Sequence, residues 1–191
     1  MITLAKTPVL VTPTMDGLGG YEDALKRGWS PDPRRVGDAA YIKAELAALR
    51  KDRVGALDRI LNHPAPAHNA SPTMPVNHTL WHALWISDGE FAGKADLRYV
   101  PETGAVPQGV PGHIGYSVVP WKQGRGYATA ALRALIDFAR SKGLTELQIL
   151  CNVENLASRT VIERVGGEVD FVGPHPSDWL EQVKLYYRVR V

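Results

Sequence analysis

Residues 117–140, SVVPWKQGRGYATAALRALIDFAR, decide the fold. An apolar, strand-like segment ends at Pro120, two glycines flank Arg125, and an amphipathic segment follows at once. Its apolar residues recur every three or four positions, which predicts a helix over residues 126–142. Backbone N–H groups and the dipole of a helix N-terminus both favour negative charge. The stretch therefore predicts an anion-binding loop at residues 123–128.

Composition limits the class of protein. The chain has 191 residues, of which 45% are apolar and 22% charged, as expected for one globular domain. A formal charge of +2 does not favour a nucleic-acid partner, and no run is long and apolar enough for a membrane span. Cys151 is the single cysteine, which excludes an internal disulfide and fits a reducing compartment. We expect a cytoplasmic, single-domain protein.

The order of elements indicates the fold class. Helices are predicted at residues 15–27, 38–51 (with Asp38 as N-cap) and 155–165, besides the one after the glycine loop. Strands are predicted at residues 8–12, 79–87, 91–100, 113–119, 147–151, 169–172 and 183–191, and a loop at 63–75. Asp88-Gly89-Glu90 is a hairpin signal. Hairpins followed by one βαβ-like crossover predict an α+β fold around a mixed, mostly antiparallel sheet flanked by helices.

Two familiar phosphate motifs do not fit the glycine loop. A P-loop requires Lys and then Ser or Thr after its last glycine, whereas Tyr127-Ala128 follow Gly126. A dinucleotide fingerprint requires a third glycine where Thr129 stands, and the next strand ends in Cys151-Asn152 without a carboxylate. An ordinary glycine-rich turn between strand and helix remains an alternative.

A third pattern, Q/R-x-x-G-x-G/A, fits Gln123-Gly-Arg-Gly126-Tyr-Ala128 at every defined position. This loop, its Val118-x-Pro120 lead-in and the element Asn155-Leu-Ala-Ser158…Gly166-Gly167 resemble the GNAT superfamily of N-acetyltransferases. The resemblance covers residues 76–191 and reaches the N-terminal part through the order of elements. It implies a GNAT-like fold with two splayed central strands, with a coenzyme-binding core at 76–191 and acceptor-side helices and loops at 1–75.

The resemblance also implies how acetyl-coenzyme A binds. The loop residues Gln123, Gly124, Arg125, Gly126, Tyr127 and Ala128 would hold the pyrophosphate, with glycines that let the backbone approach it closely. Backbone groups of Val118 and Val119 would pair with the pantetheine arm like an added strand. Asn155 and Ser158 would contact the pantetheine, although Asn155 also suits a helix N-cap. Arg125 or Lys122 would add a charge-assisted phosphate contact.

The residues that handle protons are less clearly indicated. In many members of the superfamily a Tyr seven residues after the Asn acts as the general acid, and Ile162 occupies that position here. Tyr116 shares a strand face with Val118, and His113 titrates near neutral pH, so both are catalytic candidates beside their structural alternatives. Direct attack by the amine without a dedicated base is a further alternative. Cys151 is more typical of a buried small hydrophobe than of a nucleophile.

The acceptor and partners follow from the resemblance. We expect a primary amine on a small molecule or a peptide, with Trp29 or Trp121 lining its pocket. No metal is expected, because His63, His68 and His78 lack close ligand spacing. Relatives often form homodimers, and residues 186–189 would supply an edge strand for pairing. A non-catalytic module that binds or senses acyl-coenzyme A on the same fold is the alternative function.

Overall fold

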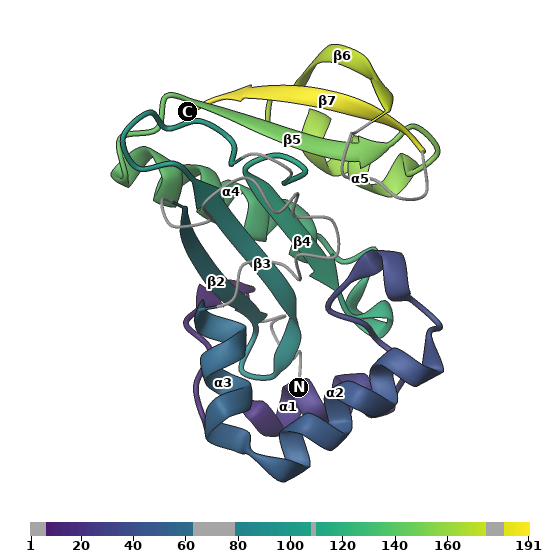
Figure 1. Ribbon diagram of the computed structural model, residues 1–191. Coiled ribbons are helices and arrows are strands. Elements are labelled where there is room, and N and C mark those ends of the chain that lie inside the picture. The colour runs from purple at the N-terminus through teal and green to yellow at the C-terminus, as the bar shows by residue number, and fades with distance from the viewer. Residues whose placement is uncertain (1–6, 63–78, 108–109, 175–181) are drawn as a thin grey trace, which may run out of the picture. The chain divides into compact units, whose positions relative to one another are not determined.

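The computed structural model describes residues 7–62, 79–107, 110–174 and 182–191 (Figure 1). The elements follow the order β1 (Val9–Val11), α1 (Leu18–Lys26), α2 (Ala39–Lys51), α3 (Arg53–Asn62), β2 (Leu80–Ser87), β3 (Phe91–Tyr99), β4 (Ile114–Val118), α4 (Tyr127–Ser141), β5 (Glu146–Asn152), α5 (Leu156–Glu163), β6 (Glu168–Pro174) and β7 (Val183–Arg190). Single 3-10 turns lie at Pro33–Arg35 and Pro120–Lys122. The α+β class is confirmed, and the predicted loop at 63–75 lies outside the described residues.

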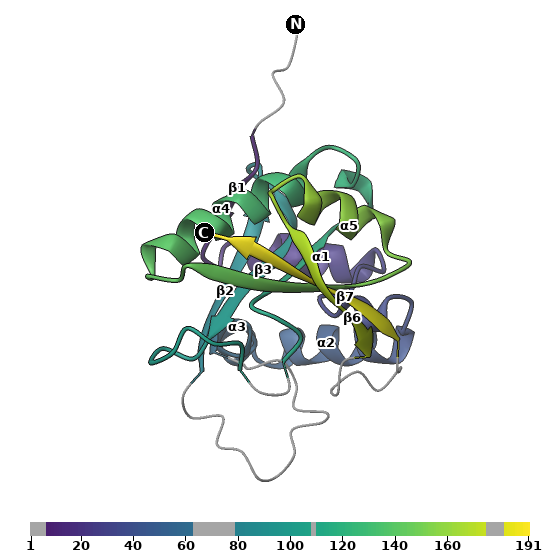
Figure 2. The ribbon, with the colours of Figure 1, turned by 90° about the horizontal axis from the view of Figure 1, so that it is seen from above.

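The strands form two sheets, with the orders β1-β2-β3-β4 and β5-β7-β6 (Figures 1 and 2). β1 pairs with β2, and β7 pairs with both β5 and β6, in each case antiparallel. The N–H of Arg98 donates to the carbonyl of His113 and that of Val119 to the carbonyl of Ala92, each at 2.9 Å. The partners run in opposite order, so β3 and β4 are antiparallel as well.

The pairing between the segment before β4 and β5 is short. Gly112 forms an isolated antiparallel bridge with Ile149, and the N–H of His113 donates to the carbonyl of Gln148 at 2.7 Å. The rest of β4 and β5 belongs to different sheets.

The C-terminal strand is not an edge strand. β7 lies between β5 and β6, so both of its edges are paired. The prediction that residues 186–189 offer a free edge is therefore wrong. β5 and β6 form the two edges of this sheet instead.

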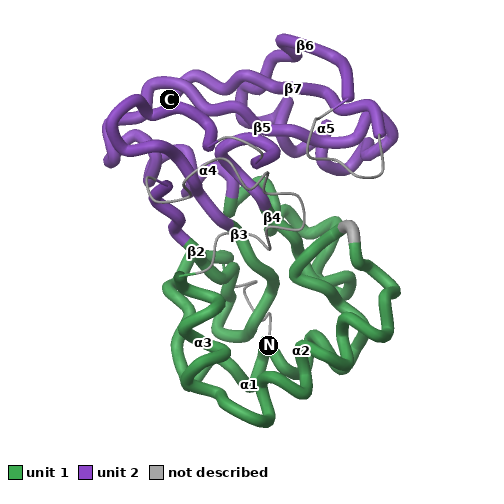
Figure 3. The backbone as a smooth tube through the Cα atoms, in the orientation of Figure 1, with its two compact units in different colours: residues 1–63, 83–95, 116–131 green, residues 64–82, 96–115, 132–191 purple. Residues whose placement is uncertain are grey.

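The chain is divided into two compact units (Figure 3). Unit 1 comprises residues 1–63, 83–95 and 116–131, and unit 2 comprises residues 64–82, 96–115 and 132–191. β2, β3, β4 and α4 each contribute residues to both units.

An aromatic cluster forms much of the core of unit 1. Its rings, at centroid distances of 5.2 to 5.8 Å in the contacting pairs, belong to Tyr21, Trp29, Trp85 and Phe91. Trp29 is 3% exposed and donates its ring N–H to Ser117 Oγ at 3.0 Å. The expectation that Trp29 lines a pocket is therefore wrong, because burial of its large ring stabilises the core.

The N-terminal helices lie together at one end of unit 1 (Figure 1). Asp38 caps α2 by accepting the Tyr41 N–H at 2.9 Å, as predicted. The sequence analysis missed α3, whose first turn contains Val54 and Gly55, both weak helix formers. Asp52 accepts the Gly55 N–H at 2.8 Å, so an N-cap aspartate was the local signal that marked this helix.

Unit 2 is organised around the apolar side of α4 and the three-stranded sheet. Its core includes the buried residues Leu132, Leu135, Ala139, Leu147, Ile149, Ile162, Tyr187 and Val189. A buried ion pair between Arg98 and Asp96 lies in the same unit, with Nη1 2.8 Å from Oδ2.

Replacement of Gly93 by Ala should destabilise the chain. Gly93 in β3 has a φ of 148°, and a Cβ there would lie 2.2 Å from the Ser117 carbonyl oxygen of β4. Such overpacking against backbone costs about 1–3 kcal/mol, measurable as a lower urea midpoint. The control is Gly19→Ala in α1, where a Cβ meets nothing within 4 Å. Alanine should raise stability there by up to about 1 kcal/mol. Equal stability of both variants would contradict the close approach of β3 and β4.

Candidate functional site

The glycine loop has the backbone geometry of a ligand-binding turn. It lies in unit 1 between the turn Pro120–Lys122 and the first residue of α4, Tyr127. Gly124 and Gly126 have φ values of 71° and 82°, in the left-handed region that favours glycine. A Cβ at either position would meet nothing within 4 Å, and both residues are exposed. The backbone of the loop is therefore accessible at both glycines.

The helix that follows adds electrostatic attraction for an anion. α4 spans Tyr127–Ser141, and its first turn contains no acidic residue. Its ladder begins at the loop, since the Ala130 N–H donates to the Gly126 carbonyl at 3.0 Å. The N–H groups of the preceding residues have no acceptor within the helix and lie at the positive end of its dipole. The start of α4 therefore favours negative charge beside the loop.

The two predicted backbone positions on β4 differ in what they offer. The N–H of Val119 donates to Ala92, and its carbonyl accepts the Lys122 N–H at 3.0 Å. Both groups of Val119 are therefore used inside unit 1. In an antiparallel ladder, the backbone groups of successive residues point alternately toward and away from the neighbouring strand. Because the N–H of Val119 is directed to β3, the backbone N–H and carbonyl of Val118 point to the outer edge of β4. The Gln123 side chain donates to the Val118 carbonyl at 2.9 Å and holds the loop against this edge.

The two cations near the loop also differ. Lys122 is 6% exposed, and its Nζ lies 2.7 Å and 2.8 Å from the two carboxylate oxygens of Asp88. Its charge is neutralised inside the protein, so the predicted phosphate contact of Lys122 is wrong. Arg125 is exposed within the loop and retains that predicted role. The hydroxyl of Tyr127 also donates to Asp88, so Tyr127 offers the loop only its backbone and ring.

Asn155 and Ser158 belong to unit 2, at the start of α5. Asn155 Oδ1 accepts the Ser158 N–H at 3.0 Å, so the N-cap role of this exposed asparagine is confirmed. Capping uses the amide oxygen, whereas the amide nitrogen carries two further donors. A contact of Asn155 and Ser158 with coenzyme stays a prediction.

The catalytic candidates lie in contrasting environments. His113 is buried in unit 2, where Nε2 lies 2.9 Å from the Gly104 carbonyl oxygen and Nδ1 accepts the Gln148 N–H at 2.8 Å. Burial lowers the pKa of His113, which keeps the ring neutral. These bonds connect three chain segments, so the geometry favours a structural role for His113. Tyr116 is half-buried on β4 in unit 1.

Two further side chains of unit 2 bear on the chemistry. Ile162, at the position of the usual acidic Tyr, is fully buried and offers no proton. Burial raises the pKa of Cys151 to about 11, so its thiolate is scarce at neutral pH. The raised pKa disfavours Cys151 as a nucleophile.

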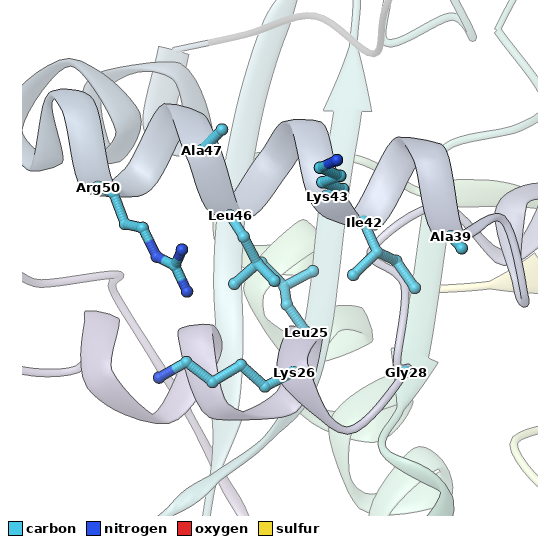
Figure 4. Close-up of a pocket in the computed structure, with 9 residues that line it drawn as sticks. All are labelled: Leu25, Lys26, Gly28, Ala39, Ile42, Lys43, Leu46, Ala47 and Arg50. Atoms are coloured by element: carbon cyan, nitrogen blue, oxygen red, sulfur yellow. The ribbon is translucent and has the colours of Figure 1, made fainter.

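A groove of about 540 Å³ lies between α1 and α2 in unit 1 (Figure 4). Leu25, Ile42 and Leu46 point toward one another between the helices, and Lys26 and Arg50 extend along the groove. The sequence analysis did not single out this groove. The apolar residues four apart on α2 were its local signal.

No helix within the described ranges combines the length and apolarity needed to cross a membrane. Among the same residues, His, Cys, Asp and Glu do not gather in groups of three that suit a metal ion. The segment with His63, His68 and His78 lies outside the part of the chain that the structure describes.

Several solved structures are similar to this fold. The comparison with curated protein sequences found no match. Mycobacterium smegmatis RimJ in complex with CoA-disulfide has a TM-score of 0.60 at 17% identity, over 98% of this chain and 83% of that one. RimL, a ribosomal L7/L12 α-N-protein acetyltransferase in complex with coenzyme A, has a TM-score of 0.58 at 16% identity, over 100% and 97%. The aminoglycoside acetyltransferase AAC(6')-Ib in complex with coenzyme A has a TM-score of 0.59 at 15% identity, over 96% and 95%.

These structural likenesses show the fold, and a family model shows the family. The model of the acetyltransferase (GNAT) domain matches residues 31–168, more than half of the chain. The matched range contains the glycine loop, α4 and the Asn155 cap. The chain therefore belongs to the GNAT family and is an acetyl-coenzyme A-dependent N-acetyltransferase.

Proposed function

We propose that the loop at residues 123–128 and the N-terminus of α4 bind the pyrophosphate of acetyl-coenzyme A, and that the acceptor is a primary amine of a small molecule or a peptide. One observation carries the coenzyme assignment. Gly124 and Gly126 both have left-handed backbones beside open space, at the start of a helix without acidic residues in its first turn. Coenzyme in complexes of the similar structures supports it.

In this proposal each coenzyme residue has a distinct task. The backbone at Gly124 and Gly126 approaches the phosphates, and Arg125 adds a charge-assisted hydrogen bond. The outer edge of β4 at Val118 pairs with the pantetheine arm, and Asn155 and Ser158 contact the same arm from α5. Gln123 keeps the loop against Val118 through its side-chain hydrogen bond.

The coenzyme supplies the acetyl group as an activated thioester. The chain must exclude water, orient the amine and provide a proton to the leaving group. We assign the proton to Tyr116, because its side chain lies on the same face of β4 as Val118 and Ile162 offers none. His113 is the second candidate, but both ring nitrogens already have partners. The amine attacks in its neutral form without a dedicated strong base, the C–S bond breaks as the amide C–N bond forms, and the proton that the nitrogen loses passes to solvent, from which Tyr116 regains the proton it gives to the thiolate.

The acceptor side is the N-terminal part of the chain in this proposal. The groove between α1 and α2 provides apolar surface there, and one of its cations, Lys26, is paired with Glu22 and Asp23. The names of the similar proteins cover both acceptor classes, since RimL acts on a ribosomal protein and AAC(6')-Ib on an aminoglycoside. We therefore propose a primary amine as the acceptor group, carried either by a small molecule or by a peptide.

The organisation of the protein forms part of the same proposal. Residues 1–191 act as one N-acetyltransferase domain, which the family match across parts of both units supports. A homodimer would pair through the edge strand β6, where Val169, Phe171 and Val172 are 49%, 55% and 50% exposed. A cytoplasmic location is supported by the lone cysteine.

Thermal unfolding with acetyl-coenzyme A, NADPH and ATP in parallel tests the coenzyme assignment. A ligand at a hundred times its dissociation constant stabilises the folded state by about 2.7 kcal/mol, so the Tm should rise with acetyl-coenzyme A alone. Release of free coenzyme A is then measured across a panel of amines, some small and some at peptide N-termini. Stabilisation by NADPH instead, or none by acetyl-coenzyme A, would refute the loop assignment. Coenzyme binding without amine-dependent release would refute the transferase reaction.

A further inference from the structure

Asp88 connects the β2–β3 hairpin to both ends of the glycine loop. It lies in the turn between Ser87 and Phe91, and its carboxylate accepts hydrogen bonds from Lys122 Nζ at 2.7 and 2.8 Å. The hydroxyl of Tyr127 donates to Asp88 Oδ2 at 2.5 Å. All of these residues belong to unit 1. One carboxylate therefore contacts the residue before the loop, Lys122, and a residue near its far end, Tyr127, where α4 begins.

The loop between these two contacts has little other side-chain support in the described structure. Gly124 and Gly126 have no side chains and adopt φ values that most residues avoid. Gln123 contributes one bond to Val118, and Arg125 is exposed. A glycine-rich loop has many accessible conformations, and a ligand that must order it loses affinity. A carboxylate that holds both ends reduces this entropic cost.

The contacts around Asp88 keep its carboxylate ionised. Burial disfavours the ionised form of Asp88, but the hydrogen bonds from Lys122 and Tyr127 outweigh it and lower its pKa to about 2. The side chains of Lys122 and Asp88 are only 8% and 16% exposed, so salt screens the pair little. Glu90 adds a contact to Lys122 Nζ at 3.3 Å from a largely exposed side chain. The carboxylate thus remains charged and bonded throughout the neutral pH range.

The local turn does not require this charge. Asp88 Oδ1 also accepts the Glu90 N–H at 3.1 Å, a contact that asparagine makes equally well in turns. An aspartate that only shaped the hairpin would need neither a buried lysine nor a tyrosine from the start of α4. The additional partners all come from the two ends of the glycine loop.

We propose that Asp88 is a positioning residue that holds the pyrophosphate loop in its binding conformation through Lys122 and Tyr127. It acts on the coenzyme through these neighbours and does not touch the reacting atoms. The inference rests on the proposed function of the loop and extends it to a residue more than thirty positions away in the sequence.

Asp88→Asn tests the inference, because it keeps the shape and the turn contact while it removes the charge. We expect the KM for acetyl-coenzyme A to rise about tenfold or more, while kcat and the KM for the amine stay within about twofold. Tyr127→Phe should have a smaller effect in the same direction. Asp88→Glu, which restores the charge, should recover part of the affinity.

The matched control is Asp96→Asn, which also removes a buried, paired carboxylate but in unit 2. It should lower the Tm while the KM for acetyl-coenzyme A of the folded enzyme stays unchanged. If Asp88→Asn lowers the Tm and leaves that KM unchanged as well, Asp88 is merely structural and the inference fails.

Hydrogen exchange of the free protein separates this inference from the proposed function. Without ligand, the amides of residues 123–127 should exchange faster in Asp88→Asn than in the wild type. In Asp96→Asn these amides should exchange at the wild-type rate. Unchanged exchange of the loop amides would overturn the inference. If the wild type does not bind acetyl-coenzyme A, the proposed function fails, and the exchange data still decide whether Asp88 holds the loop.

Discussion

Gly126→Asp is expected to abolish acetyl-coenzyme A binding while the chain stays folded. The backbone at Gly126 has a φ of 82°, and a Cβ there would meet nothing within 4 Å, so a side chain would extend into the space that the proposal gives to the coenzyme. Aspartate places a side chain and a negative charge into that space, opposite the phosphates. Affinity should fall by at least about 100-fold, which corresponds to about 2.8 kcal/mol of binding free energy. Isothermal titration calorimetry measures this loss directly.

Two variants separate the causes of that loss. Gly126→Asn has nearly the same shape without the charge and tolerates the left-handed backbone, so it should bind better than Gly126→Asp. Gly143→Asp introduces the same residue at a similar φ of 83°, also with nothing within 4 Å, at the other end of α4. It should bind acetyl-coenzyme A normally. Normal binding by Gly126→Asp would place the pyrophosphate elsewhere, and equal loss in Gly143→Asp would implicate backbone strain.

Arg98→Met should be the most destabilising single replacement considered for the fold. Arg98 is 6% exposed and donates to Asp96 Oδ2 and to the carbonyls of Pro111 and Gly112, each at 2.8 Å. Methionine fills much of the volume but leaves the buried carboxylate of Asp96 without this partner. Loss of one member of a buried pair typically costs 3–5 kcal/mol, a large part of the stability of a small domain. Urea unfolding monitored by circular dichroism gives the change in free energy.

An exposed arginine provides the control for this prediction. Arg188 on β7 pairs with Asp170 at 2.7 Å, but both side chains are about half exposed, at 46% and 50%. Such surface pairs contribute about 0–1 kcal/mol, so Arg188→Met should unfold close to the wild type. A loss below about 1 kcal/mol in Arg98→Met would show that the buried pair does not hold residues 111–112 against β3.

Local signals were sufficient for most of the secondary structure. The Asp38 cap, the Asp88-Gly89-Glu90 turn and the helix after the glycine loop all depend on neighbours within a few residues. The missed helix α3 also had a local signal in Asp52, but weak helix formers in its first turn obscured it. The glycine loop was predictable because the need for left-handed backbones restricts the residue type at Gly124 and Gly126.

Sequence alone determined the α+β class, the family resemblance and the position of the glycine loop before α4, since these depend on spacing, turn chemistry and periodicity. Tertiary structure alone decided that Lys122 is buried against Asp88, that Trp29 belongs to the core and that β7 lies inside its sheet. It also decided that the Val119 N–H is used by β3. These outcomes depend on partners tens of residues away, 34 positions for Lys122 and Asp88 and 88 for Trp29 and Ser117. No local pattern specifies such partners, because burial and pairing are set by the strands and helices that surround a side chain after the chain has folded.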